Sequence, residues 1–135
     1  MQSMRYLNMF SKVCRVQTKY CFNYNNSLVF IVPNSKVTMA IGPGAKNAKM
    51  LSSKLGHKIK IIGIGPQPTR DGLMKFISTL ADQTTINKLD FKDSEVSITG
   101  GRQTKASLIG RNRIREKELL NILNGVFGIK TIKFN

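Results

Sequence analysis

The first half of this sequence contains no acidic residue. Residues 1–66 hold ten lysines and arginines, whereas residues 67–135 hold twelve basic residues and all seven acidic ones. The two halves therefore carry charges of +10 and +5, which together make the net charge of +15. A field of this size attracts polyanions, so nucleic acid is the first class of partner to consider. A merely solubilising surface is the simpler alternative.

Cysteine and histidine are scarce. Cys14 and Cys21 are the two cysteines, they do not form a Cys-x-x-Cys pair, and His57 is the single histidine. This set cannot complete a zinc site, and we expect no bound metal. It implies no disulfide framework either, which favours a reducing compartment, and we expect a cytoplasmic protein.

Long apolar runs are also missing. No stretch approaches the roughly 20 residues that a membrane-spanning helix needs, so we expect no membrane partner. The acid-free N-terminus has the composition of an organellar transit peptide. Residues 3–12 instead fit the opening helix of the repeat described below.

Nothing in the sequence forms a catalytic constellation. His57 has no carboxylate in its half of the chain and would be a poor general base. No Walker-type phosphate loop is present. Asp90, Asp93 and Glu95 cluster where a strand turn is expected and could attract a divalent ion, but the solvation of a turn explains them more simply. We therefore expect no enzyme, no catalytic residue and no cofactor.

What the sequence does contain is a repeat. Ile41-Gly42 and Ile109-Gly110 lie 68 positions apart, each after a short helical pattern. Each pair opens a second helical pattern that stops at a glycine, and a β-branched run follows at residues 58–62 and 130–134. A duplicated helix–glycine loop–helix on a basic chain points towards nucleic acid.

The periodicity predicts the same order of elements in both halves. The first half is predicted to contain a helix at 3–12, strands at 14–22 and 28–32, helices at 35–41 and 45–55, and a strand at 58–64. The second half is predicted to contain a helix capped by Thr69 or Asp71, strands at 84–91 and 95–99, helices at 102–109 and 114–124, and a strand at 129–134. Glycine and proline between residues 63 and 68 predict a short linker, which gives domains at 1–66 and 67–135.

Several segments within this order carry a family likeness. They are Arg5-Tyr6-Leu7 with Phe10, the apolar run 28–32, Met39 to Gly42 continuing to Lys46-Asn47, and Phe127-Gly128-Ile129. With the loop between two helices, each half resembles a type II KH domain. The tandem pair is similar to the archaeal NusA-like transcription factors, which consist of two KH modules and little else.

The resemblance implies an α+β fold of two tandem type II KH modules. Each module would run helix–strand–strand–helix–loop–helix–strand, with the helices on one face of a three-stranded sheet. It implies a monomeric protein that binds single-stranded RNA, engages nascent transcript, and acts in transcription elongation, termination or antitermination, with RNA polymerase as a further partner.

The loops depart from the family pattern, which has glycine at both ends of each tetrad and a lysine inside. The first tetrad is Gly42-Pro43-Gly44-Ala45, with alanine as its last residue. The second is Gly110-Arg111-Asn112-Arg113, which ends in arginine. Glycine would let phosphate approach the main chain, and the following helix would present amides to it. Besides the two tetrads, the resemblance implies RNA contacts from Lys46, Lys49 and Arg115.

Each of these interpretations has an alternative. Gly42 and Gly110 could serve only to break helices, and the lysines could form an ordinary solvated helix face. The second loop's arginines could instead pair with Glu116 and Glu118, which would weaken a phosphate site. These arginines are Arg111, Arg113 and Arg115. The protein could also be a ribosome-associated or structural RNA-binding protein with degenerate KH loops, whose charge docks on folded RNA.

Overall fold

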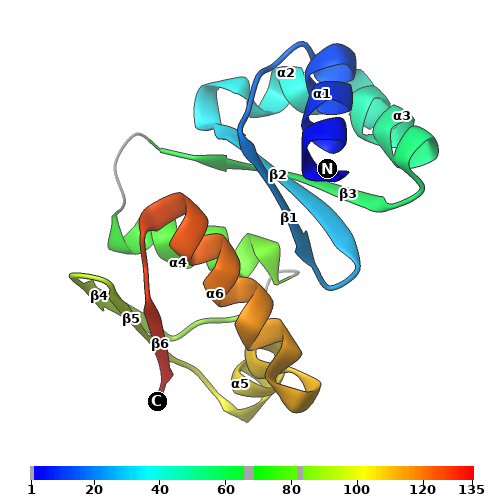
Figure 1. Ribbon diagram of the computed structural model, residues 1–135. Coiled ribbons are helices and arrows are strands. Elements are labelled where there is room, and N and C mark those ends of the chain that lie inside the picture. Colours follow the sequence, from blue (N-terminus) through cyan, green and yellow to red (C-terminus); the bar gives the residue numbers. More distant parts are fainter. Residues whose placement is uncertain (1, 66–68, 82–83) are drawn as a thin grey trace. The chain divides into compact units, whose positions relative to one another are not determined.

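The computed structural model describes residues 2–65, 69–81 and 84–135. The chain divides into two compact units, Met1–Pro66 and Gln67–Asn135, and both have the same order of helices and strands (Figure 1). Each unit contains one three-stranded sheet, so the predicted α+β class is confirmed. Part of the predicted linker, residues 66–68, lies outside the described residues. Within the described ranges, no helix is long and apolar enough to cross a membrane.

The first unit is built on a mixed sheet. Strand β1 pairs antiparallel with β2, and β2 pairs parallel with β3. A parallel pair needs a crossover connection, which two helices and the loop between them supply here. In chain order the elements are α1 (Gln2–Cys14), β1 (Tyr20–Tyr24), β2 (Ser27–Pro33), α2 (Val37–Ile41), α3 (Lys46–Leu55) and β3 (Lys58–Ile64), with short 3-10 turns at Asn34–Lys36 and Pro43–Ala45.

The core of the first unit lies between its helices and one face of the sheet. Leu28, Phe30 and Val32 alternate along β2 and therefore share a face. The Phe10 ring from α1 stacks on Phe30 with 4.5 Å between ring centroids. The same buried cluster takes in Cys14 of α1, Ala40 of α2 and Leu51 of α3. All three helices thus pack on one face of the sheet.

The strand predicted at 14–22 is placed wrongly. Cys14 is the last residue of α1, because it lies one turn beyond Phe10 on the buried helix face. Arg15 then adopts a positive φ of 57° and ends the helix, and the strand begins at Tyr20. The hairpin turns at Asn25 and Asn26, both with positive φ, as a two-residue hairpin loop requires.

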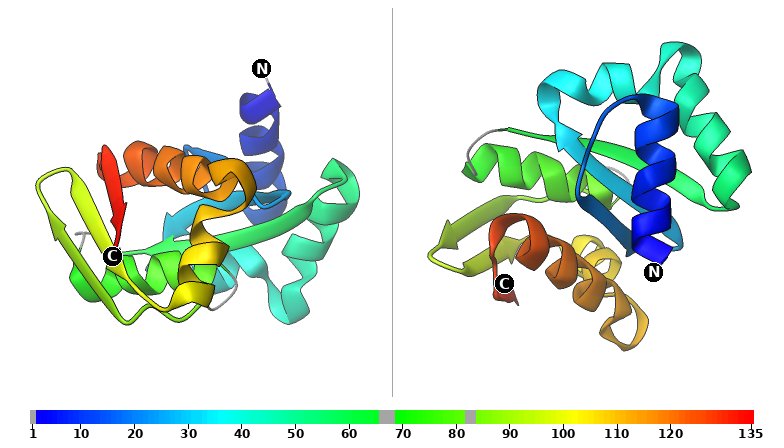
Figure 2. Two further views of the ribbon diagram at one scale, coloured as in Figure 1. Left: turned by 90° about the horizontal axis from the view of Figure 1, so that it is seen from below. Right: turned by 45° about the horizontal axis from the view of Figure 1, so that its top comes forward.

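The second unit repeats this topology. Strand β4 pairs antiparallel with β5, and β5 pairs parallel with β6. Thr69 caps the first helix, since its Oγ1 accepts a hydrogen bond from the Gly72 amide at 2.9 Å. The elements are α4 (Arg70–Leu80), β4 (Lys88–Lys92), β5 (Glu95–Thr99), α5 (Arg102–Ile109), α6 (Ile114–Phe127) and β6 (Thr131–Phe134). In both views of Figure 2, α5 and α6 meet at the second loop.

One face of the second sheet is apolar and the other is polar. Along β5, Val96 and Ile98 are buried and alternate with half-exposed polar residues. The Phe76 and Phe127 rings meet edge to face at 5.4 Å and join α4 to α6. Helix α6 ends at Gly128, which has a φ of 74°. Of the two glycines predicted to end it, Gly125 lies inside the helix.

Candidate nucleic-acid interface

The two glycine loops have the same backbone conformation although they share only their first residue. Gly42 has φ 80° and ψ 167°, and Gly110 has φ 72° and ψ 175°. The third and fourth residues of each tetrad are left-handed, with φ between 56° and 60° at Gly44, Ala45, Asn112 and Arg113. The fold therefore imposes one loop shape on two sequences.

The hydrogen bonds of the loops match as well. The amide of Gly42 donates to the Thr38 carbonyl at 3.0 Å, and the amide of Gly110 donates to the Ala106 carbonyl at 3.0 Å. Each loop then closes on itself. The Ala45 amide donates to the Gly42 carbonyl at 3.1 Å, and in the second loop the Arg113 amide donates to the Gly110 carbonyl at 3.2 Å. These bonds fix where the next helix starts.

The opening glycine of each tetrad has a structural role. A Cβ on Gly42 would lie 3.0 Å from Cγ of Asn47, and a Cβ on Gly110 would lie 2.6 Å from Cγ of Arg115. The space beside these glycines is therefore filled by the protein itself. Nothing lies within 4 Å of the position that a Cβ on Gly44 would occupy. Among the tetrad glycines, Gly44 is the one that leaves room for a ligand to approach the main chain.

Each loop is followed by a helix whose first turn has no side-chain cap. In the described residues, no side chain makes a capping hydrogen bond at the start of α3 or of α6. The first amide of each helix donates to the preceding 3-10 turn, from Lys46 to the Pro43 carbonyl and from Ile114 to the Arg111 carbonyl. The helix N-terminus as a whole carries a partial positive charge. Together with a nearby cation, this arrangement suits an anion such as phosphate.

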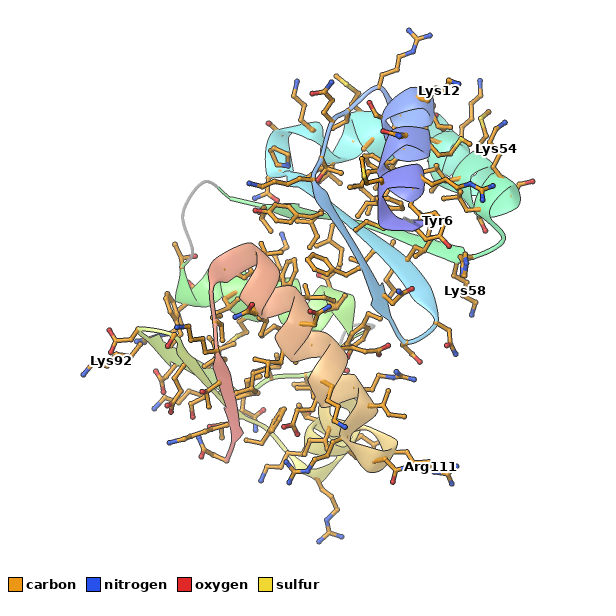
Figure 3. The ribbon with its side chains drawn as sticks, viewed as in Figure 1. Tyr6, Lys12, Lys54, Lys58, Lys92 and Arg111 are labelled. Atoms are coloured by element: carbon orange, nitrogen blue, oxygen red, sulfur yellow. The ribbon has the colours of Figure 1, made fainter. Side chains whose placement is uncertain are left out.

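The cations of the first loop have no acidic neighbour in their own unit, since residues 1–66 contain none. Lys46 and Lys49 are exposed in the first turn and a half of α3, beside exposed Pro43 and Gly44. All of these predicted residues thus lie together at one end of α3. Lys12 and Lys54 also point outward from the first unit (Figure 3).

The cations of the second loop are partly paired. Arg111 and Asn112 are exposed, and the Arg111 side chain extends away from the loop (Figure 3). Nη1 of Arg113 lies 3.5 Å from Oε2 of Glu116. Nη1 of Arg115 donates to Oε1 of Glu118 at 2.6 Å, and both side chains are only 25% exposed. Arg115 therefore holds the loop in place and is less available to a ligand than Arg111.

Sequence reasoning overlooked two residues that the repeat relates to predicted ones. Asn47 corresponds to Arg115, 68 positions later, and its Nδ2 donates to the Met39 carbonyl at 3.3 Å. It thereby connects the end of α2 to the start of α3. Lys117 corresponds to Lys49 and is likewise exposed. The 68-position offset between Gly42 and Gly110 is the sequence signal that identifies Asn47 and Lys117.

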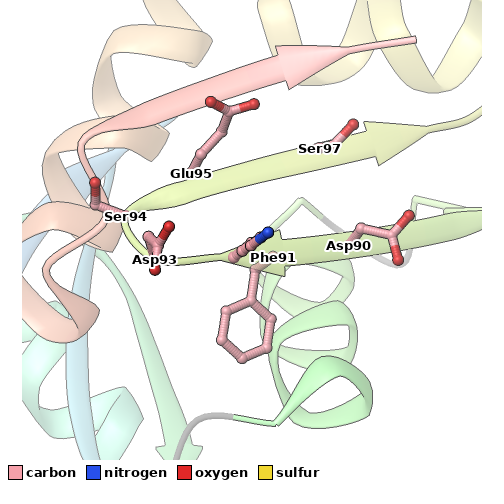
Figure 4. A pocket seen from close by; sticks show the side chains of 7 residues that line it. Asp90, Phe91, Asp93, Ser94, Glu95 and Ser97 are labelled. Atoms are coloured by element: carbon pink, nitrogen blue, oxygen red, sulfur yellow. The ribbon is translucent and has the colours of Figure 1, made fainter.

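Two of the three acidic residues at the β4–β5 turn, Asp90 and Glu95, form ion pairs with neighbouring cations. They border a surface hollow of about 480 Å³ (Figure 4). Asp90 lies 3.5 Å from Arg70 and 3.6 Å from Lys88, and Glu95 lies 3.2 Å from Lys133. Across residues 2–65, 69–81 and 84–135, no three metal-ligating side chains gather at one point.

The two cysteines and the isoleucines of β3 lie in half-buried or apolar surroundings and have structural roles. Burial raises the pKa of the Cys14 and Cys21 thiols to about 11, so both stay protonated at neutral pH. Ile59 and Ile61 of β3 pack against the core of the first unit.

Comparison with known proteins identifies the fold alone. No family model matches the chain, and no curated protein matches it. It is similar to the solved structure described as "Crystal structure of APE1850", with a TM-score of 0.69 and 22% sequence identity. That likeness covers 99% of this chain and 98% of the other. At this level of identity it establishes a shared fold and says nothing about activity.

Proposed function

We propose that this protein binds single-stranded RNA through its two glycine loops, as a tandem pair of type II KH modules. The observation that carries the proposal is the shared loop geometry. Two tetrads of different sequence hold the same left-handed backbone, each at a helix N-terminus that has no side-chain cap and has cations beside it. Non-glycine residues in this conformation are strained, and strain of this kind clusters at ligand sites.

In the first loop, phosphate would approach the main chain at Gly44, where no side chain intervenes. The α3 amides and the ammonium groups of Lys46 and Lys49 would then surround it with positive charge. KH modules clamp the backbone of about four nucleotides, which leaves the bases accessible for recognition. Because bases in a duplex are paired and stacked, a strand held in this way has to be single.

The family resemblance extends the proposal to a biological setting. A protein similar to the NusA-like factors would act in the cytoplasm as a monomer and engage nascent transcript. It would influence elongation, termination or antitermination, with RNA polymerase as its second partner. The support for this step is the order of the segments at Arg5–Phe10, 28–32, 39–47 and 127–129, together with the repeated topology.

The test is the salt dependence of binding to a short unstructured oligoribonucleotide, followed by fluorescence anisotropy. If about six phosphates are neutralised, log K should fall with log salt with a slope near −4, from roughly −0.7 for each phosphate on a single strand. Binding that does not change between low and moderate salt would contradict the proposal.

A second candidate function is docking on folded RNA, as in a ribosome-associated protein. The ion pairs of Arg113 and Arg115 favour it, since they leave the second loop with less free charge than its sequence suggests. The same titration with a structured RNA of equal length separates the two functions. Tighter binding to the structured RNA would favour this candidate.

A further inference from the structure

The two loops differ at one position of the first helical turn. Glu116 lies in the first turn of α6, whereas α3 has no acidic residue in its first turn. The 68-residue offset places Ala48 at the corresponding position of α3. Two loops with the same backbone thus carry a carboxylate in one copy and a methyl group in the other.

Glu116 and Glu118 make different kinds of ion pair. The Arg113–Glu116 pair is long, at 3.5 Å, and the Arg113 side chain is 71% exposed. Such a pair is weak and is readily exchanged for another anion. The Arg115–Glu118 pair is short, at 2.6 Å, and the stem of Arg115 packs against Gly110. Glu118 therefore fixes a side chain that is already part of the loop's structure.

We infer that Glu116 determines how strongly the second loop binds RNA phosphate, as a competing anion built into the helix. The inference rests on the proposed function. The Glu116 side chain is only 21% exposed, so its negative charge stays close to the start of α6 even when Arg113 moves away. It interacts with Arg113 and with the positive end of the helix dipole, which are the groups that would bind a phosphate. An incoming phosphate has to displace it from Arg113 or bind beside it at a cost in repulsion.

Glu118 has a separate role under this inference. Loss of its charge would weaken the short hydrogen bond from the Arg115 guanidinium while leaving the Arg115 stem against Gly110. The expected consequence is a less firmly held loop and not a new phosphate contact. The two glutamates, two residues apart, should therefore respond differently to the same substitution.

The experiment compares three single substitutions of equal charge change in the full chain: Glu116→Gln, Glu118→Gln and Asp90→Asn. Asp90 of β4 is paired with Arg70 of α4 and Lys88 of β4, and serves as the control for net charge. The ¹⁵N-labelled protein is titrated with an unstructured oligoribonucleotide at low salt. Amide resonances of residues 110–115 report the second loop, and those of residues 42–47 report the first. Thermal unfolding of each variant is measured alongside.

We expect Glu116→Gln to tighten RNA binding at the second loop roughly two- to fivefold, which is the range of a single exposed charge pair. The magnitude of the salt slope should rise by about 0.7 as one more phosphate is neutralised. Asp90→Asn should change affinity at the second loop only slightly. Glu118→Gln should lower the unfolding temperature and leave affinity at the second loop unimproved.

Ala48→Glu provides the reciprocal change in the first loop and should weaken RNA binding there by a similar factor. If it unfolds the protein, Glu116→Gln still decides the matter. Suppose that the wild type binds RNA at the first loop but Glu116→Gln binds it no more tightly than Asp90→Asn does. That result would overturn this inference and leave the proposed function intact. If the wild type binds RNA at neither loop, both this inference and the proposed function are overturned.

Discussion

Ala45 and Arg113 hold the same left-handed backbone conformation, with φ 59° and ψ 30° at Ala45 and φ 60° and ψ 25° at Arg113. Each is the last residue of its tetrad. An L-residue with a Cβ pays roughly 1–2 kcal/mol for this conformation, because Cβ approaches the following carbonyl oxygen. The surrounding helices must supply that free energy in both units.

Replacement of either residue by glycine should therefore stabilise its unit. We expect Ala45→Gly and Arg113→Gly each to raise the free energy of unfolding by about 0.5 kcal/mol, since relief of strain exceeds the extra entropy of glycine in the unfolded chain. Urea unfolding measures the change. Lys46→Gly is the control, because Lys46 has φ −56° and glycine should cost about 1 kcal/mol inside a helix. Equal losses at Ala45 and Lys46 would show that the loop is not left-handed in solution.

The opening and inner glycines of the first loop should differ in their tolerance of alanine. Gly42→Ala should cost about 2–3 kcal/mol, since its backbone conformation is nearly restricted to glycine and Asn47 lies 3.0 Å from the new Cβ. Gly44→Ala should cost only about 1 kcal/mol, because its surroundings are open. Thermal unfolding of both variants tests the order, and a reversed order would contradict the packing of Asn47 against Gly42.

Charge reversal should weaken RNA binding most at the first loop. We expect Lys46→Glu combined with Lys49→Glu to reduce affinity by about tenfold or more, since phosphate contacts are lost and repulsion is added. The matched pair Lys12→Glu and Lys19→Glu lies outside the loop and outside α3, and should reduce it by no more than about threefold. Fluorescence anisotropy with one oligoribonucleotide at one salt concentration gives both values. Equal losses would indicate diffuse attraction to the whole unit.

The two thiols should be unreactive in the folded protein. With a pKa of about 11, roughly one thiol in a thousand is ionised at pH 8, against about one in ten in the unfolded chain. Iodoacetamide should therefore alkylate Cys14 and Cys21 slowly until denaturant is added. Because burial raises the pKa from 9.0, the associated stability is present below pH 9 and is lost as the pH rises to about 11. Rapid alkylation of the native protein would contradict the burial of these side chains.

Local sequence signals predicted most elements because each depends on neighbours in the chain. The strand at 58–64 and the helix at 102–109 were predicted with the bounds that the structure has, and Thr69 was named as a possible cap. The start of β1 was missed. Its position at Tyr20 depends on pairing with Ile31 of β2 and on the contact of Cys14 with the core, neither of which a local pattern contains.

For the candidate site as well, some features follow from the sequence and others follow only from the fold. Residue identity alone shows where the two loops lie, how they repeat and which residues carry charge, since glycine, helix periodicity and lysine content are properties of the chain. The fold adds that Ala45 and Arg113 are left-handed, that Asn47 and Arg115 fill the space beside the opening glycines, and that Glu116 and Glu118 pair with the second loop's arginines. Backbone conformation and side-chain pairing at these positions follow from how the helices on either side of each loop pack, and that packing is a property of the whole unit.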